Sequence, residues 1–339
     1  INTPLAINKI TTIEKIEDLV ELSEQVRNGI NYEGVEVKLA NSLDFNDNNS
    51  YNDYTNTIYG DLNGDGQTKG IKEELTDQNG KGFTPIGLIV KLPFSGSFNG
   101  QGNEIKNIYI NATNVDAGLF GYVLNGKIEN IGVSGNITGT NNVGGIVGYY
   151  SGQNDIKKCY NNANINGTCS GGIVGYYSAK YKNIIGCYNT GKIEGNNYAG
   201  GIIGNKTDYV GVYNCYNIGN VSANINNGYA GAITGNNAIV SKCYYIDNVN
   251  IAGKTINNLG ISKDSEYMKT EEFINEISDN YFTKDTENIN NEFPIIKFEN
   301  NETTDNFIIE KIEDLVKLSQ MSNLGELGKD VKIVLNNTI

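Results

Sequence analysis

The chain has 339 residues, a net charge of −13, no His and a single Arg, Arg27. The negative charge excludes nucleic acid and anionic lipid as expected partners, because both bind through clusters of basic side chains. The lack of His excludes imidazole metal sites and most His-based catalysis, and no apolar run is long enough for direct membrane insertion.

The N-terminal region, residues 1–110, is expected to hold a capping helix and the first coils of a solenoid. Apolar residues from Ile13 to Val26 recur at helical spacing and predict an amphipathic α-helix that begins at Thr11-Thr12 and ends at Gly29. The strand-like segment VEVKLANSLDF follows the helix. An open solenoid exposes strand edges at its ends, so this helix would cap one end.

An Asx-rich insertion at about 45–82 contains the segment DLNGDG at 61–66. Asp61, Asn63 and Asp65 place oxygen ligands at alternate positions before a Gly, as a calcium loop begins. Position twelve of such a loop is Lys72 rather than the usual acid. Calcium is therefore the one cofactor that the sequence suggests, and a plain Asx-rich turn is the alternative.

A repeated unit fills residues 111–250 and carries the motifs GLFGYV, GGIVGYY (twice), GGIIGNK and GAITGNN. Cys159, Cys187, Cys215 and Cys243 lie 28 residues apart, and Ile131 fills the same place one unit earlier. Each unit has three short apolar pieces separated by Gly- and Asn-rich corners. This pattern predicts an all-β parallel β-helix with three short strands per coil of about 28 residues, in which the Cys column is buried and free of disulfides.

These units resemble the GLUG repeat of bacterial surface adhesins and of proteins related to IgA peptidases. The resemblance lies in GLFGYV with KIENIGVSGNITG, and in the GGIVGYY units with IKKCYNNANINGT and IIGCYNTGKIEG. It implies a right-handed β-helix displayed outside a bacterial cell, at the surface or cell wall, with the leader and anchor outside this fragment. It implies no catalytic residue, and a chain without His has no HExxH zinc helix.

Tyrosines form the candidate ligand-binding surface. Tyr160, Tyr188, Tyr216 and Tyr244 each follow a column Cys, so strand alternation predicts an outward-facing ladder. A second candidate patch, with Tyr149 and Tyr176 as its main members, comprises Tyr149, Tyr150, Tyr176, Tyr177 and Tyr181. Such rings bind sugars or a protein partner, although a ladder of like aromatics also stabilises stacked coils.

The C-terminal part divides into a closing segment at 251–305, expected to form a small α/β cap, and the start of a second module at 306–339. IEKIEDLVELS at 13–23 returns as IEKIEDLVKLS at 309–319, a shift of 296 residues. The chain is therefore expected to be one of several tandem modules.

The sequence favours a non-catalytic module of a bacterial cell-surface protein. It would either bind a host or bacterial surface glycan or protein, as an adhesin does, or act as a rigid stalk. The alternative is a polysaccharide-active lyase or glycosidase, which needs two acids near one bond. Aligned at 28 residues, Glu129 meets Lys157, Asp155 meets Asn183, and Glu194 meets Ser222, so these columns contain no acid pair.

Overall fold

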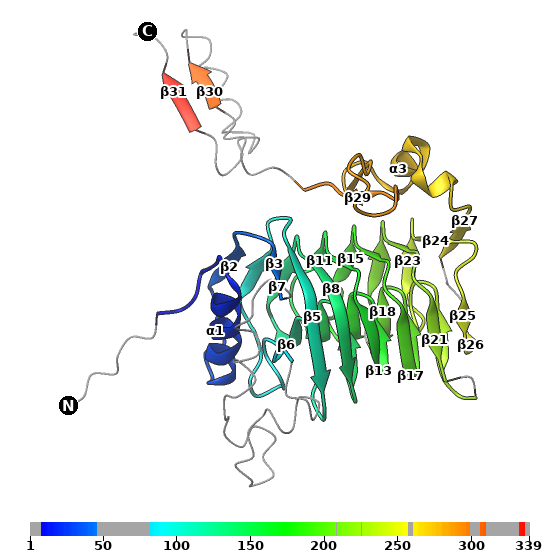
Figure 1. Cartoon of the computed structure of the whole chain (residues 1–339), viewed down its shortest axis with the longest axis horizontal. Coiled ribbons are helices and arrows are strands. Elements are labelled where there is room, and N and C mark those ends of the chain that lie inside the picture. The colour runs from blue at the N-terminus through cyan, green and yellow to red at the C-terminus, as the bar shows by residue number, and fades with distance from the viewer. Residues whose placement is uncertain are drawn as a thin grey trace, which may run out of the picture. The chain divides into compact units, whose positions relative to one another are not determined.

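A computed structural model describes residues 8–45, 82–207, 209–224, 226–256 and 260–298, and two strands at 306–309 and 332–335. The chain divides into two compact units, Ile1–Phe298 and Glu299–Ile339. The first unit is a β-solenoid of about seven turns with few helices, and the strands of its coils pair in parallel (Figure 1). The predicted parallel β-helix is therefore confirmed.

Three parallel sheets, which we name A, B and C, form the sides of the coils. Sheet A contains β1 (Thr12–Ile13), β2 (Glu36–Leu39), β4 (Ser97–Asn99), β7 (Lys127–Glu129), β11 (Ile156–Lys157), β15 (Asn183–Ile185), β19 (Gly211–Tyr213) and β23 (Ile239–Ser241). Sheet C contains β6 (Phe120–Leu124), β10 (Val147–Ser151), β14 (Val174–Tyr177) and β18 (Ile203–Lys206). Sheet B contains β3 (Leu43–Asp44), β5 (Glu104–Ala112), β8 (Gly132–Gly139), β9 (Asn142–Gly144), β12 (Tyr160–Asn161), β13 (Asn164–Gly171), β16 (Tyr188–Asn189), β17 (Ile193–Gly200), β20 (Tyr216–Asn217), β21 (Val221–Ala223), β22 (Tyr229–Gly231), β24 (Tyr244–Ile246), β25 (Ile251–Ala252), β26 (Lys254–Thr255) and β27 (Ile261–Lys263).

The coils at 147–171 and 174–200 show how the chain passes through the sheets. Each forms one strand of sheet C, one of sheet A and two of sheet B, so it has four strands where the sequence predicts three. The additional break follows Asn161 in β12 and Asn189 in β16. The side chain of Asn161 donates to the carbonyl of Ala163 at 2.8 Å and accepts from its N–H at 3.1 Å. A side chain that takes backbone partners in this way interrupts the strand, and the chain resumes in sheet B as β13.

The interior is filled by columns of equivalent side chains from successive coils. Cys159, Cys187, Cys215 and Cys243 are free and at most 1% exposed, so the predicted burial of this column is confirmed. The N–H of Cys159 donates to Sγ of Cys187, 28 residues further along the chain, at 3.4 Å. Each thiol therefore occupies the interior space that Ile131 fills one coil earlier.

A second interior column consists of three fully buried asparagines, Asn161, Asn189 and Asn217. The Nδ2 of Asn161 donates to Oδ1 of Asn189 at 2.7 Å, and the Nδ2 of Asn189 donates to Oδ1 of Asn217 at 2.7 Å. These amides also explain the paired glycines of the repeat. A Cβ on Gly172 would lie 2.6 Å from Cγ of Asn189, and one on Gly201 would lie 2.4 Å from Cγ of Asn217. The GG and CYN motifs are therefore parts of one packing unit.

The N-terminal helix α1 (Ile16–Arg27) buries Ile16, Leu19 and Leu22 in the same core as the coils. Its predicted start is wrong, because Thr12 and Ile13 form β1, which pairs with β2 in sheet A. The reason is local: Asp18 accepts hydrogen bonds from the N–H groups of residues 14 and 15 and holds the preceding chain extended.

The end of the helix matches the prediction. The helix stops at Arg27, and Gly29 lies in the left-handed region with a φ of 93°. A glycine there is the usual helix terminator.

The predicted C-terminal cap is a lateral cover instead. Residues 264–298, which we name the strap, contain a 3₁₀ turn (Tyr267–Lys269), α3 (Glu271–Ile277), β28 (Phe282–Thr283) and β29 (Ile295–Ile296). In Figure 1 the segment with α3 and β29 lies along the side of the coils. The ring of Phe273 packs against that of Tyr244 with a centroid distance of 5.1 Å, and the ring of Phe282 packs against that of Tyr216 with a centroid distance of 5.5 Å. Phe298 lies against Gly102 in an early coil. The strap therefore runs back along the solenoid.

The second unit contains a parallel pair of strands, β30 (Asn306–Ile309) and β31 (Lys332–Leu335). Ile309 pairs with Leu335, as Ile13 pairs with Leu39 in the first unit. The register of the first strand pair is thus repeated after the same shift that the sequence shows.

Candidate binding surfaces

The first tyrosine column, which we name the buried tyrosine column, consists of Tyr160, Tyr188, Tyr216 and Tyr244. The ring of Tyr188 stacks on those of Tyr160 and Tyr216, with centroid distances of 5.0 and 4.9 Å, so the predicted ladder exists. It lies under the strap, however: Tyr188, Tyr216 and Tyr244 are 3%, 0% and 3% exposed. Their predicted exposure is wrong, because the apolar side of the strap covers the rings.

Hydrogen bonds hold Tyr216 in this covered position. Its hydroxyl donates to the carbonyl of Pro294 and accepts from Nδ2 of Asn290, the latter at 2.7 Å. Burial raises the pKa of the Tyr216 and Tyr188 hydroxyls above the ordinary value. Tyr160 is the partly buried member, and burial, with the nearby carboxylate of Glu104, raises the pKa of its hydroxyl. Three of the four rings thus present no face at the surface.

The second column, which we name the outer tyrosine column, comprises Tyr122, Tyr149 and Tyr176 on sheet C. The rings stack at 4.7 and 5.0 Å with planes within 10°, and all three are half-buried. Sequence reasoning found Tyr149 and Tyr176 but missed Tyr122, although it holds the same position in GLFGYV. Neighbouring rings cover one another's faces, so the column presents ring edges and hydroxyls at intervals of one coil.

A partly buried carboxyl group, Asp116, stands beside the outer tyrosine column. Its Oδ1 accepts from the N–H of Asn142 at 3.3 Å and from Nδ2 of Asn142 at 2.7 Å. Burial raises the pKa of Asp116 to about 6, against the opposing effect of the two Asn142 hydrogen bonds. Burial also raises the pKa of Tyr122 to about 12, with further contributions from Tyr149 and from Asp116. Hydroxyl, amide and carboxyl groups therefore meet on this face.

A third aromatic feature stands at the corner between sheets C and A. Tyr181 and Tyr209 are 67% and 69% exposed, and their rings are parallel within 4° at a centroid distance of 6.2 Å. Tyr181 has a φ of 58°, in the left-handed region. The sequence places Tyr181 in the predicted second patch but Tyr209 was missed, although the 28-residue spacing of the two tyrosines was a signal that could have identified the pair. Tyr150 and Tyr177, also predicted in that patch, are fully buried.

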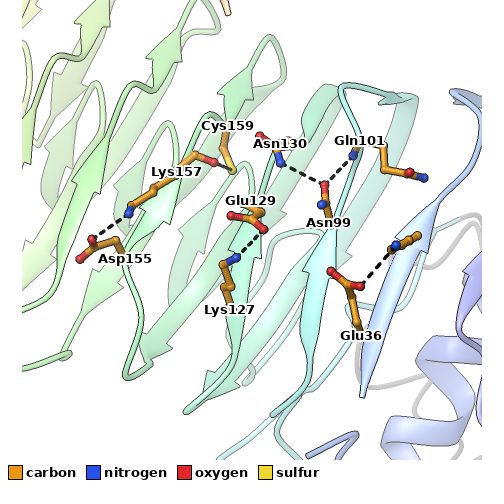
Figure 2. Close-up of polar contacts among 10 residues, drawn as sticks. Glu36, Asn99, Gln101, Lys127, Glu129, Asn130, Asp155, Lys157 and Cys159 are labelled. Carbon is orange, nitrogen blue, oxygen red and sulfur yellow. Dashed lines mark hydrogen bonds and ion pairs between the residues drawn. The ribbon is translucent and has the colours of Figure 1, made fainter. Parts of the chain in front are cut away.

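The acids on the outer side of sheet A each contact a lysine (Figure 2). Glu129 bonds to Lys127 at 2.5 Å, and Asp155 lies 3.3 Å from Lys157. The strand register places Glu129 opposite Lys157, as the 28-residue alignment predicts. The carboxylates of this face therefore contact cations within their own strands or corners rather than acids on adjacent coils.

The predicted calcium ligands Asp61, Asn63 and Asp65 lie outside the residues that the structure describes. Among those it does describe, no three Cys, Asp or Glu side chains are grouped so that they could hold a metal ion. No helix in the described part of the chain is long and apolar enough to cross a membrane.

Comparisons with known proteins give one structural likeness. No family model matches the chain, and the search of curated proteins finds no match. The GLUG resemblance therefore stays a prediction. The chain is similar in structure to a protein from Bacteroides ovatus described as a "putative immunoglobulin A1 protease", with a TM-score of 0.53 and 18% identity. The likeness covers 86% of this chain and 93% of the other, and it shows the fold alone.

Proposed function

We propose that the chain is a non-catalytic module of a bacterial cell-surface protein that binds a glycan or protein on another surface. The observation that carries the proposal is the outer tyrosine column, which stands partly exposed on sheet C, where the inward side chains such as Val147 and Val174 are buried in the core. Rigid aromatic side chains lose little conformational entropy on binding and supply large contact areas. Bacterial surface location is supported by the GLUG resemblance of the repeats.

The finer features of the fold belong to the same proposal. We take the β-helix to be right-handed, because connections between parallel strands of one sheet are right-handed in roughly 98% of cases. We take α1 as the cap of the N-terminal end, because it buries its apolar side in the core of the coils.

The arrangement of acids supports a module without catalysis. A glycosidase needs two carboxyl groups roughly 5 to 9.5 Å apart around one bond, with one of them protonated. Glu129 and Asp155 contact lysines instead, and Glu194 bonds to Lys192 at 2.7 Å. The rival function is a polysaccharide-active enzyme. Incubation with polysaccharides and with immunoglobulin A1 tests it: new reducing ends or protein fragments would favour the rival.

A spacer role is the second candidate, and the repeated strand register favours it. Because β30 and β31 repeat the pairing of β1 and β2, tandem modules of this kind would form a stalk. An array of glycans and extracellular-matrix proteins separates the two roles. Binding that is lost on Tyr149→Ala and Tyr176→Ala supports adhesion, and an array without signal supports the spacer.

We also propose that the 45–82 segment binds calcium through Asp61, Asn63 and Asp65. The support is the alternation of oxygen-bearing side chains before a Gly. Calorimetric titration of calcium into chelator-treated protein is expected to release heat that Asp65→Ala abolishes. A flat titration of the wild-type chain would remove the proposal.

A further inference from the structure

The corner with Tyr181 and Tyr209 differs from the other tyrosine stacks in how much of each ring meets water. The rings of the outer tyrosine column touch at 4.7 to 5.0 Å, whereas these two lie 6.2 Å apart and are about two-thirds exposed. Wide separation with parallel planes leaves ring surface uncovered on both residues. This corner is therefore the place in the described solenoid where stacked aromatic faces are open to a ligand.

Backbone conformation at this corner does not favour a large side chain. Tyr181 has a φ of 58°, which costs a residue other than Gly roughly 1 kcal/mol. The ring recovers little of this through packing, because 67% of the residue is exposed. A strained and exposed aromatic residue is typical of a functional position.

One cation and several neutral polar groups lie near the two rings in space or in sequence. Nζ of Lys180 stands 5.4 Å from the centroid of the Tyr181 ring. The hydroxyl of Thr207 donates to that of Ser178 at 3.2 Å, and these residues precede Tyr209 and Tyr181 by two and three positions. On the other side of Tyr181, Asn183 accepts from the N–H of Gly211 at 3.2 Å. Hydroxyl and amide groups therefore lie within three sequence positions of each tyrosine.

We infer that the Tyr181 and Tyr209 corner is a platform for a neutral polysaccharide, an inference that rests on the adhesive function proposed above. A pyranose ring combines an apolar C–H face with a rim of hydroxyls, which matches open aromatic faces near amides and hydroxyls. The two rings stand on adjacent coils with their centroids 6.2 Å apart, so they can contact neighbouring sugar units of one chain. The net charge of −13 opposes acidic polymers.

The test is native electrophoresis of the full chain through gels that contain hydroxyethyl cellulose, laminarin, mannan or dextran, with polygalacturonate as the acidic comparison. We expect retardation by at least one neutral polymer, and at least a tenfold loss of affinity in the double variant Tyr181→Ala, Tyr209→Ala. The matched control is Tyr198→Ala, Tyr229→Ala, which removes another surface stack, at 5.6 Å, and should retain binding. The double variant Tyr181→Phe, Tyr209→Phe keeps both rings and should also bind.

The inference is overturned by equal retardation of the Ala variant, by retardation in polygalacturonate alone, by loss of binding in the Phe variant, or by a protein ligand that is lost on the same substitutions. If no neutral polymer binds but the array detects another ligand, the inference fails and the adhesive function stands. If neither assay detects binding, both fail. Circular dichroism melting of each variant shows that any loss comes from a folded chain.

Discussion

Replacing one amide of the buried asparagine column should destabilise the solenoid strongly. Asn189 makes three side-chain hydrogen bonds: it accepts from Asn161 at 2.7 Å, and donates to Asn217 at 2.7 Å and to the carbonyl of Gly191 at 2.8 Å. Asn189→Ala removes all three and leaves buried partners unsatisfied. Each bond contributes about 1 kcal/mol net, and an orphaned buried group adds about 1 kcal/mol or more. We expect a loss of about 3 to 5 kcal/mol.

The assay is urea unfolding followed by circular dichroism, with Asn164→Ala as the matched control. Asn164 also belongs to a ladder of 28-residue spacing, where it donates to Asn136 at 3.2 Å, but it is exposed. Water replaces its partners, so the control should change stability by less than about 0.5 kcal/mol. Equal losses in the two variants would refute the argument that burial makes the asparagine column essential.

Four further predictions concern Asp116, the five thiols, Tyr216 and Tyr181. Burial raises the pKa of Asp116 to about 6, above the value near 4 in an unfolded chain, so its contribution to stability is lost as pH rises from 4 to 6. Asp116→Asn should therefore raise the free energy of unfolding, relative to wild type, by about 2 kcal/mol more at pH 7 than at pH 4. A stabilisation that is the same at both pH values in thermal melts would contradict this. Because all five thiols are buried, they should react with a disulfide reagent only in denaturant; fast labelling of the native protein would show the core to be open. Tyr216→Phe removes the hydroxyl bonded to Pro294 and Asn290 and should loosen the strap, seen as faster cleavage of the strap in limited proteolysis, whereas an unchanged cleavage rate would count against those bonds. Tyr181→Gly relieves a positive φ and should raise the melting temperature slightly or leave it unchanged, while a large fall would show that the ring stabilises the corner.

The regular coils could be predicted because each side chain stacks on its own equivalent. In sheets A and B most paired residues of adjacent regular coils lie 28 positions apart, so the 28-residue alignment correctly predicts the pairs Ile165 with Ile193 and Tyr188 with Tyr216. In sheet C the spacing is 27 for Val147 with Val174 and 29 for Val174 with Ile203. The alignment also fails at Cys169, which pairs with Tyr198, 29 residues on, because the register shifts after Gly167; this thiol lies outside the column of interior thiols. Inward and outward sides then follow from strand alternation.

The strap could not be predicted from the same pattern. Alternation places Tyr188, Tyr216 and Tyr244 on the outer side of sheet B, and it holds no information about what covers that side. The cover comes from Phe273 and Phe282, which lie in a segment without the repeat, so no alignment relates them to the rings. For the same reason the outward tyrosines predicted as a binding site are divided by the structure into covered and open columns.

The most direct test of the central claim is adhesion of beads coated with the full chain to surfaces coated with the polymer or protein that the binding assays identify. Wild-type beads should stay attached under flow. Beads coated with a variant that has Ala at Tyr149, Tyr176, Tyr181 and Tyr209, and that keeps its melting temperature within a few degrees, should detach. Equal retention of wild-type and variant beads would contradict a binding role for the outward tyrosines.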